Sequence, residues 1–332
     1  MKKIFLLIFC LILLLCGCGK YNENSFIRDY QKKIQKLKSY KLSGKLEIVN
    51  NNDVYDYDIV VSYKKNNKYK VYIKNDSNEH EQYILRNNDG VYLLTPSLNK
   101  SFKFQSDWPY NNSQIYLLNS ILNDIKNDDK LKFKIKNSKY IVTCKVNYNN
   151  NKKLSYEKIV FDKRLNIQNI KIYDKDGIVR MNMKFKNIDY SPIFKDNYFD
   201  LKYIVKNSTS STINEKKISS ELDSIYPLSL PSGTKLIDEE KVKKDNGNRI
   251  IMTFDGEKSF LLVEETSDTS DNLMIIPTYG EPYRLMDTIG VMTDNSLSWS
   301  SGGIDYYLVS DVLNTNELVN IAESINILPT MK

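Results

Sequence analysis

The chain is poor in the two residue types on which much enzyme chemistry depends. Its 332 residues include one histidine, His80, and four cysteines, Cys10, Cys16, Cys18 and Cys144. Histidine is the usual general base near pH 7, and clustered Cys and His residues are the usual zinc ligands. The sequence has no HExxH and no CxxC motif. We therefore expect no catalytic residues, no metal and no cofactor.

The isolated candidates for chemistry have simpler structural interpretations. His80 lies in "NDSNEHEQY", where we expect an exposed histidine at a hairpin tip. Cys144 could be a nucleophile, but in "YIVTCKVNY" it alternates with Val142 and Val146, which predicts a buried core cysteine. With Cys10 and Cys16 in a predicted signal segment and Cys18 predicted to be acylated, no disulfide framework is expected.

Three further motifs are weak. "DKDG" at 174–177 resembles the start of a calcium loop but lacks the later ligands, and it predicts a β-turn. "SSGG" at 300–303 predicts a hairpin turn rather than a phosphate loop. Glu239 and Glu240 form a carboxylate pair that nothing in the sequence places in a cleft.

The amino terminus has the pattern of a bacterial export signal. Lys2 and Lys3 precede an apolar run from Ile4 to Leu15, which is too short for a permanent span of roughly 20 residues. "LCGC" at 15–18 resembles a lipobox, in which Gly17 precedes the cleaved bond and Cys18 carries a diacylglyceryl thioether. An ordinary secretory signal with incidental cysteines is the alternative. We predict a signal peptide over 1–17, a lipidated tether over 18–25, and localisation at the extracytoplasmic face of the cell membrane.

Charge divides the chain into two parts. Residues 226–332 carry 8 Lys+Arg against 17 Asp+Glu, although the whole chain has a formal net charge of +7. The preceding part is therefore strongly basic. A basic exported surface is attracted to an anionic leaflet or cell-wall polymer, and we expect no nucleic-acid partner. The change in charge predicts a domain boundary near 226.

Periodicity predicts an α+β protein. "FIRDYQKKIQKLKSY" has an amphipathic helical stripe, and from Tyr40 to about Tyr203 the apolar residues alternate as in antiparallel strands. "SQIYLLNSILNDI" interrupts the strands with a second helical stripe. A long sheet must cover its apolar face. We therefore predict a domain over 26–205 in which a curved, unclosed half-barrel is covered by helices and encloses a possible cavity.

A linker and a second, smaller α+β domain are predicted to follow. Residues 206–225 combine the polar stretch "KNSTSSTIN" with a short helix marked by Ile218, Leu222 and Ile225. Residues 226–332 show strands, a turn-rich middle, and a hairpin at Gly302 and Gly303. They end in "NTNELVNIAESI", where Asn314 and Glu317 have the spacing of a capping box.

Tyrosine is abundant on the early strands. Of the 24 tyrosines, Tyr55, Tyr57, Tyr63, Tyr69, Tyr72, Tyr83 and Tyr92 are clustered there. Such rings suit an apolar groove with solvent-exposed edges or a protein interface. Ordinary filling of a β-sheet is the alternative explanation.

Several segments resemble a known family. "FIRDYQKKIQKLKSYKLSGKLEI", "NNDGVYLLTPSLNKSFKFQSDWPYNNSQIYLLNSIL" and "FDKRLNIQNIKIYDKDG" are similar to the lipoprotein-sorting fold of LolA, LolB and RseB. The similarity covers about 24–203 and is greatest with the Gram-positive branch of sporulation and germination lipoproteins, which includes GerS and YdcC. Residues from "YPLSLPSGTKL" onward resemble an uncharacterised extracellular domain of sporulation proteins.

The resemblance implies a half-barrel with helices on its concave face, and a protein that binds acyl chains, lipids or proteins without catalysis. We therefore expect a membrane-anchored envelope lipoprotein of sporulation or germination that binds a partner protein, such as a cell-wall amidase, or an apolar ligand. A regulator of an anti-sigma factor in the manner of RseB, a carrier of lipid or lipoprotein acyl chains, and a hydrolase are the alternatives. Oligomer formation through open sheet edges is possible.

Overall fold

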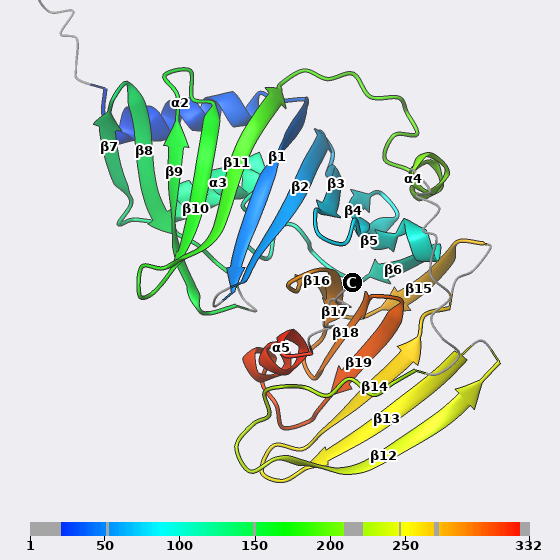
Figure 1. Ribbon diagram of the computed structural model, residues 1–332. Coiled ribbons are helices and arrows are strands. Elements are labelled where there is room, and N and C mark those ends of the chain that lie inside the picture. Colours follow the sequence, from blue (N-terminus) through cyan, green and yellow to red (C-terminus); the bar gives the residue numbers. More distant parts are fainter. Residues whose placement is uncertain are drawn as a thin grey trace, which may run out of the picture.

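The computed structural model describes residues 21–50, 53–148, 151–208, 222–245, 247–268 and 272–325. These residues form two open sheets, one of twelve strands and one of seven, together with a few short helices (Figure 1). The predicted fold class, a curved unclosed sheet followed by a second α+β unit, is confirmed.

The larger sheet consists mainly of two antiparallel meanders. The order of its strands is β15-β6-β5-β4-β3-β2-β1-β11-β10-β9-β8-β7, and the two meanders join where β1 pairs with β11. The first meander comprises β1 (Ser39–Asn50), β2 (Asp53–Lys64), β3 (Lys68–Asn75), β4 (Glu81–Asn87), β5 (Gly90–Thr95) and β6 (Lys100–Phe104). The second comprises β7 (Lys132–Lys136), β8 (Lys139–Lys145), β9 (Leu154–Phe161), β10 (Ile167–Asp174) and β11 (Val179–Asp189). A 3-10 turn, η1 (Pro96–Leu98), lies between β5 and β6.

Two helices pack on the concave face of this sheet, as predicted. Helix α2 (Glu23–Gln35) buries Phe26, Tyr30 and Ile34, and α3 (Leu118–Asn127) buries residues of the second predicted stripe, including Ile121 and Ile125. Phe26 packs edge-on against Phe161 of β9, with 5.0 Å between the ring centroids. Helix α2 begins at Glu23, so the last three residues of the predicted tether are helical.

A third helix, which the sequence pattern does not predict, covers part of the opposite face. Helix α4 (Leu201–Asn207) packs Leu201 and Ile204 against Leu85 and Leu94 of strands β4 and β5. The sequence predicts strands as far as Tyr203 and a linker from 206. The seven-residue helix is short for a periodicity signal, and its apolar residues contact a surface formed by distant residues.

The smaller sheet has the order β12-β13-β14-β19-β18-β17-β16. Its strands are β12 (Lys235–Lys244), β13 (Gly247–Asp255), β14 (Phe260–Thr266), β16 (Glu281–Arg284), β17 (Ile289–Met292), β18 (Ser296–Ser301) and β19 (Ile304–Val309). The predicted hairpin turns between β18 and β19, where Gly302 and Gly303 have φ values of 58° and 80°. Helix α5 (Thr315–Glu323) has the predicted capping box, in which Asn314 accepts from the backbone N–H of Glu317.

The segment before β12 differs from its prediction. Leu222 and Ile225 were expected to mark a short helix, but residues 222–227 have no regular secondary structure. Leu222 is instead buried in the core of the smaller sheet, and Ile225 packs against that core. Apolar spacing therefore identified residues that face a core but not the backbone conformation that places them there. Ile218 and the rest of 209–221 lie outside the described residues.

One strand of the second unit belongs to the first sheet. Strand β15 (Met274–Thr278) pairs in parallel with β6, with Met274 opposite Lys100 and Thr278 opposite Phe104. Figure 1 shows β15 beside β6, at the junction of the two sheets. The change in charge near 226 gave no sign of this exchange. Pro277 is tolerated because β15 is an edge strand.

The predicted signal peptide and the lipid attachment residue Cys18 lie outside the described residues. Within the part of the chain that the structure describes, none of the helices has the length and apolar composition needed to cross a bilayer.

Candidate binding site

The concave face of the larger sheet is the candidate binding site. Its base is formed by alternate side chains of the sheet, including Leu46 of β1, Ile84 of β4 and Met181 of β11. The segment before α3 supplies one wall with Trp108 and Tyr116. The remaining wall comes from Pro282, Tyr283, Arg284 and Ile289 of the second unit.

The space left inside these walls is small. The cavity has a volume of about 90 Å³. Ligand pockets usually measure roughly 300–1,000 Å³, and a water molecule in the liquid has a share of about 30 Å³. The cavity therefore has room for a few waters but not for an acyl chain.

A hairpin of the second unit occupies the mouth of the concave face. We call residues 281–292, which comprise β16, β17 and the turn between them, the docking hairpin. Ile289 and Val291 of this hairpin belong to the core of the larger sheet. Leu285 and Met292 belong to the core of the smaller sheet. The docking hairpin is thus shared by the two hydrophobic cores, and it accounts for the small volume of the cavity.

Gln82 of β4 holds the docking hairpin by its backbone. Its Oε1 accepts a hydrogen bond from the N–H of Ile289 at 2.7 Å, and its Nε2 donates to the carbonyl oxygen of Ile289 at 3.0 Å. The Gln82 side chain is buried, so both bonds are shielded from water. This pairing satisfies two backbone groups of Ile289 that would otherwise be buried without partners.

Further polar contacts surround this pair. The hydroxyl of Tyr57 donates to the carbonyl oxygen of Met286, and Nδ2 of Asn75 donates to the carbonyl oxygen of Asp287 at 3.2 Å. His80 Nε2 lies 3.5 Å from Thr288 Oγ1. Side chains of strands β2 and β3 therefore bind the main chain of the turn of the docking hairpin, and the segment that precedes β4 contacts the Thr288 side chain.

Arg284 lies between two aromatic rings of the first unit. Its guanidinium carbon is 5.3 Å from the ring centroid of Tyr57 and 5.8 Å from that of Tyr116. Both distances are within the range of cation–π attraction. Arg284 therefore joins the docking hairpin to β2 and to the segment before α3, and it places a positive charge at the wall of an otherwise largely apolar cavity.

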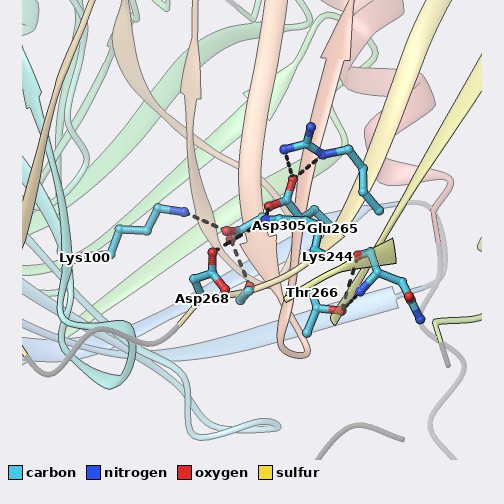
Figure 2. A network of polar contacts seen from close by, with 9 residues as sticks. Lys100, Lys244, Glu265, Thr266, Asp268 and Asp305 are labelled. Carbon is cyan, nitrogen blue, oxygen red and sulfur yellow. Dashed lines mark hydrogen bonds and ion pairs between the residues drawn. The ribbon is translucent and has the colours of Figure 1, made fainter. Parts of the chain in front are cut away.

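A polar network connects the two sheets at a second place. Lys100 Nζ of β6 forms a salt bridge of 2.7 Å with Asp305 Oδ2 of β19, and Ser267 Oγ donates to Asp305 Oδ1 at 3.0 Å (Figure 2). The Lys100 and Asp305 side chains are 16% and 25% exposed, so water screens this ion pair only in part. Together with the pairing of β15 and β6, this network fixes the second unit against the edge of the larger sheet.

Buried acidic groups lie behind the cavity. Burial raises the pKa of Asp124 in α3 to about 7, against the opposing effect of a hydrogen bond from Ser113. Burial, followed by the charge of Asp124, holds the pKa of Glu157 in β9 well above its usual range. Both shifts have the same main cause, which is that burial disfavours the charged form of a carboxyl group.

Cys144 has the role predicted for it. The thiol is buried and donates to Glu157 Oε1 at 3.5 Å. Burial, and then the nearby carboxyl groups, raise the pKa of Cys144. Because the thiolate is the reactive form, these surroundings oppose nucleophilic chemistry.

The prediction for His80 was wrong. We expected an exposed histidine at a hairpin tip, but His80 is partly buried and lies against Thr288 of the docking hairpin. Burial lowers the pKa of His80, while Asp287 opposes the shift. The histidine does follow the turn between β3 and β4, as expected. Its neighbour Thr288 is 208 residues away in the sequence. No local pattern could have predicted that contact.

The weaker motifs are structural. At 174–177, Asp174 Oδ1 accepts hydrogen bonds from the backbone N–H of Asp176 and Ile178, and Oδ2 accepts from Arg180, which makes this segment a turn. Glu239 accepts from Tyr226 and Ser224 on the surface of the second unit. Among the described residues, no group of three or more His, Cys, Asp or Glu side chains could hold a metal ion.

The clustered tyrosines do not form one groove. Tyr57 and Tyr69 are buried within the core under the concave face, whereas Tyr83 and Tyr92 pack with α4 on the opposite side. Tyr72 packs against Tyr83 in a tilted arrangement on that side, with 5.1 Å between the ring centroids. Tyr57 contacts the docking hairpin, so the cluster contributes one residue to the candidate site and several to ordinary packing of the sheet.

Sequence patterns do not identify the residues that define this site, which are Gln82, Arg284 and Ile289. Gln82 offered a signal, because it shares an alternating face with Ile84 and is a polar residue in an apolar stripe. Arg284 and Ile289 lie in a turn-rich segment without periodicity, and their partners are about 170 to 230 residues away in the sequence.

Comparison with known proteins supplies one relative of nearly the full length. No family model matches the chain. The sporulation protein YdcC of Bacillus subtilis (strain 168) is 37% identical over 314 residues, which cover 94% of this chain and 93% of that protein.

Solved structures also align with the chain, at low scores. The Pseudomonas aeruginosa MucA/MucB complex aligns over 92% of this chain and 98% of the other, with 10% identity and a TM-score of 0.33. The CwlD amidase of Clostridioides difficile in complex with the GerS lipoprotein aligns over 51% of this chain and 96% of the other, with 16% identity and a TM-score of 0.24. The family assignment rests on the full-length relative.

The fold and the site define a two-sheet α+β protein whose curved sheet is closed by a hairpin of its own second unit. The chain belongs to the family of sporulation protein YdcC. The sporulation branch that its sequence resembles is thereby confirmed.

Proposed function

We propose that this chain is a non-catalytic lipoprotein of the cell envelope, anchored through Cys18, which binds a partner protein during sporulation or germination. The observation that carries this proposal is the docked hairpin. It occupies the concave face and leaves about 90 Å³, so that the accessible surface suits a macromolecule better than an enclosed ligand. Membership in a sporulation protein family supports the stage of the life cycle.

Absence of catalysis is part of the proposal. His80 is partly buried against Thr288 of the docking hairpin, and Cys144 is a buried thiol with a raised pKa. Assays of the purified chain on peptidoglycan should show no turnover. Turnover that disappears on substitution of His80 or Cys144 would refute this part.

The partner class that we would test first is a cell-wall amidase, because the amino-terminal unit resembles the germination lipoproteins. Crosslinking with mass spectrometry in sporulating cells should recover an envelope enzyme attached to this chain. Deletion of the gene should impair spore formation or germination and leave vegetative growth unchanged. Normal spores and normal germination in the deletion strain would contradict the proposal. Recovery of a single-pass anti-sigma protein instead would favour a regulatory role.

A bound apolar ligand is the second candidate function. The apolar and aromatic lining of the cavity favours it, as does the position of Arg284, which could pair with an anionic head group. A ligand of that size requires the docking hairpin to leave the concave face. Mass spectrometry of protein purified without detergent should then detect a lipid in stoichiometric amount, and its absence would leave the protein-binding role.

A further inference from the structure

Strands β7, β8 and β9 carry a lysine-rich face. Between residues 132 and 161 the sequence has eight lysines and a single acidic residue, Glu157. Glu157 is buried and lies opposite Cys144 on the core side of the sheet, so it adds no carboxyl group to the lysine-rich face. The exposed lysines of the face are Lys132, Lys134, Lys136, Lys139, Lys145 and Lys158.

The strand register places these six lysines on the same side of the sheet. Lys136 is opposite Lys139, and Lys132 is opposite Thr143, which in turn is opposite Lys158 of β9. Lys134 and Lys145 follow by alternation along β7 and β8. The other side of these strands faces the core and α2. In the described part of the chain, none of the six lysines forms a salt bridge with a carboxylate.

The amino-terminal end of the described chain lies at the same edge of the sheet. The ring centroid of Tyr21 is 5.0 Å from that of Tyr140 in β8 and 6.4 Å from that of Phe133 in β7. Figure 1 shows the start of α2 beside β7 and β8. Cys18 precedes Tyr21 by three residues. Three residues span at most about 11 Å, so a lipid attached at residue 18 would hold this edge close to the membrane.

We propose that the lysine face of β7–β9 is a membrane-contact surface that binds anionic lipid head groups. A lysine close to an anionic surface gains attraction that decays within a Debye length, which is about 8 Å at physiological salt. A single lipid modification combined with a basic patch is a recurrent means of stable anchoring. The contact orients the chain with β7 toward the membrane and the acidic second unit away from it. The orientation rests on the proposed anchor, whereas the affinity of the face for lipid does not.

The opposite edge of the protein offers a matched control. Strand β12 is the outer strand of the smaller sheet, just as β7 is the outer strand of the larger sheet. Lys235, Lys241 and Lys243 of β12 are exposed, as are Lys132, Lys134 and Lys136 of β7. Lysines on an outer strand also discourage pairing between molecules. The lysines of both strands can prevent such pairing, so this effect cannot explain a difference in lipid binding between the two sets of lysines.

The test uses the chain from Gly19 onward, which contains every residue that the structure describes and lacks the lipid attachment site. Its sedimentation is measured with vesicles of phosphatidylglycerol mixed with phosphatidylcholine, and with vesicles of phosphatidylcholine alone. We expect binding only to the anionic vesicles and a decrease in binding as salt is raised. Lys132→Gln, Lys134→Gln and Lys136→Gln together should weaken the partition coefficient about tenfold, if each loses half of the usual attraction of a lysine near the surface. The corresponding triple substitution of Lys235, Lys241 and Lys243 should change it less than twofold.

Three results would overturn the proposal: equal binding to both kinds of vesicle, equal loss in the two triple variants, or binding to soluble polyphosphate without binding to vesicles. The last result would assign the face to a phosphate-bearing polymer. Unchanged thermal unfolding of both variants ensures that a loss reports the surface and not the fold. Since the assay contains neither the anchor nor a partner protein, its outcome is independent of the proposed function.

Discussion

Removal of the Gln82 side chain should release the docking hairpin. In Gln82→Ala the N–H and the carbonyl group of Ile289 both lose their partners at a buried position. A buried polar group left without a hydrogen bond costs about 1–3 kcal/mol. Entry of water into the space of the lost side chain offsets part of that cost. We expect the docked state to lose about 2–4 kcal/mol relative to the open state.

Hydrogen exchange of the docking hairpin measures this loss directly. If exchange at Ile289 requires the hairpin to open, a loss of 2–4 kcal/mol corresponds to exchange that is about 30- to 900-fold faster. Peptides that cover β13 and β14 report the core of the second unit and should change much less. Gln168→Ala is the matched control, because Gln168 is an exposed glutamine on β10 of the same sheet. Its effect should lie within about 0.5 kcal/mol of zero.

Gln82→Glu adds a test through pH. A glutamate keeps the acceptor for the Ile289 N–H but replaces the donor to the Ile289 carbonyl with a carboxyl group that can donate only when protonated. Burial raises the pKa of such a group in the docked state, so docking should be favoured at low pH and weakened as pH rises above about 4. Exchange rates that are the same in the parent, Gln82→Ala and Gln82→Glu would refute the role of Gln82 as the residue that holds the hairpin.

Three further predictions concern buried and capping groups. Asp124→Asn should raise the free energy of unfolding by an amount that grows between pH 4 and pH 7 and reaches at most about 4 kcal/mol. The reason is that the pKa of Asp124 is raised in the folded state, so the parent protein loses stability as this carboxyl group ionises. Parallel pH profiles of the two proteins in urea unfolding would contradict this. Cys144 should react with a maleimide at once in denaturant, but in the native protein only at the rate at which the structure opens, because the thiol is buried with a raised pKa. Rapid labelling under native conditions would refute the assignment of Cys144 as a core residue. Asn314→Ala should cost about 1 kcal/mol through loss of the cap on α5, measured as the shift in thermal unfolding against Asn314→Ser, which keeps a side-chain oxygen that can cap the helix.

Local periodicity was sufficient to predict most of the elements. Alternation along the strands, the stripes of α2 and α3, and the capping box of α5 each depend on residues within one or two turns of one another. Such patterns determine which face of an element is apolar. They also placed Cys144 in the core, since its neighbours on β8 at alternate positions are apolar.

Sequence by itself determined the two units, the covered curved sheet, the likeness to sporulation lipoproteins and the uneven charge. Tertiary structure alone decided that β15 pairs with β6, that the docking hairpin closes the concave face, and that Gln82 and Arg284 are the residues that hold it there. The physical reason is the distance along the chain. An apolar face must be covered, but which of several distant segments covers it depends on the fit of shapes and hydrogen-bonding groups that meet only after folding.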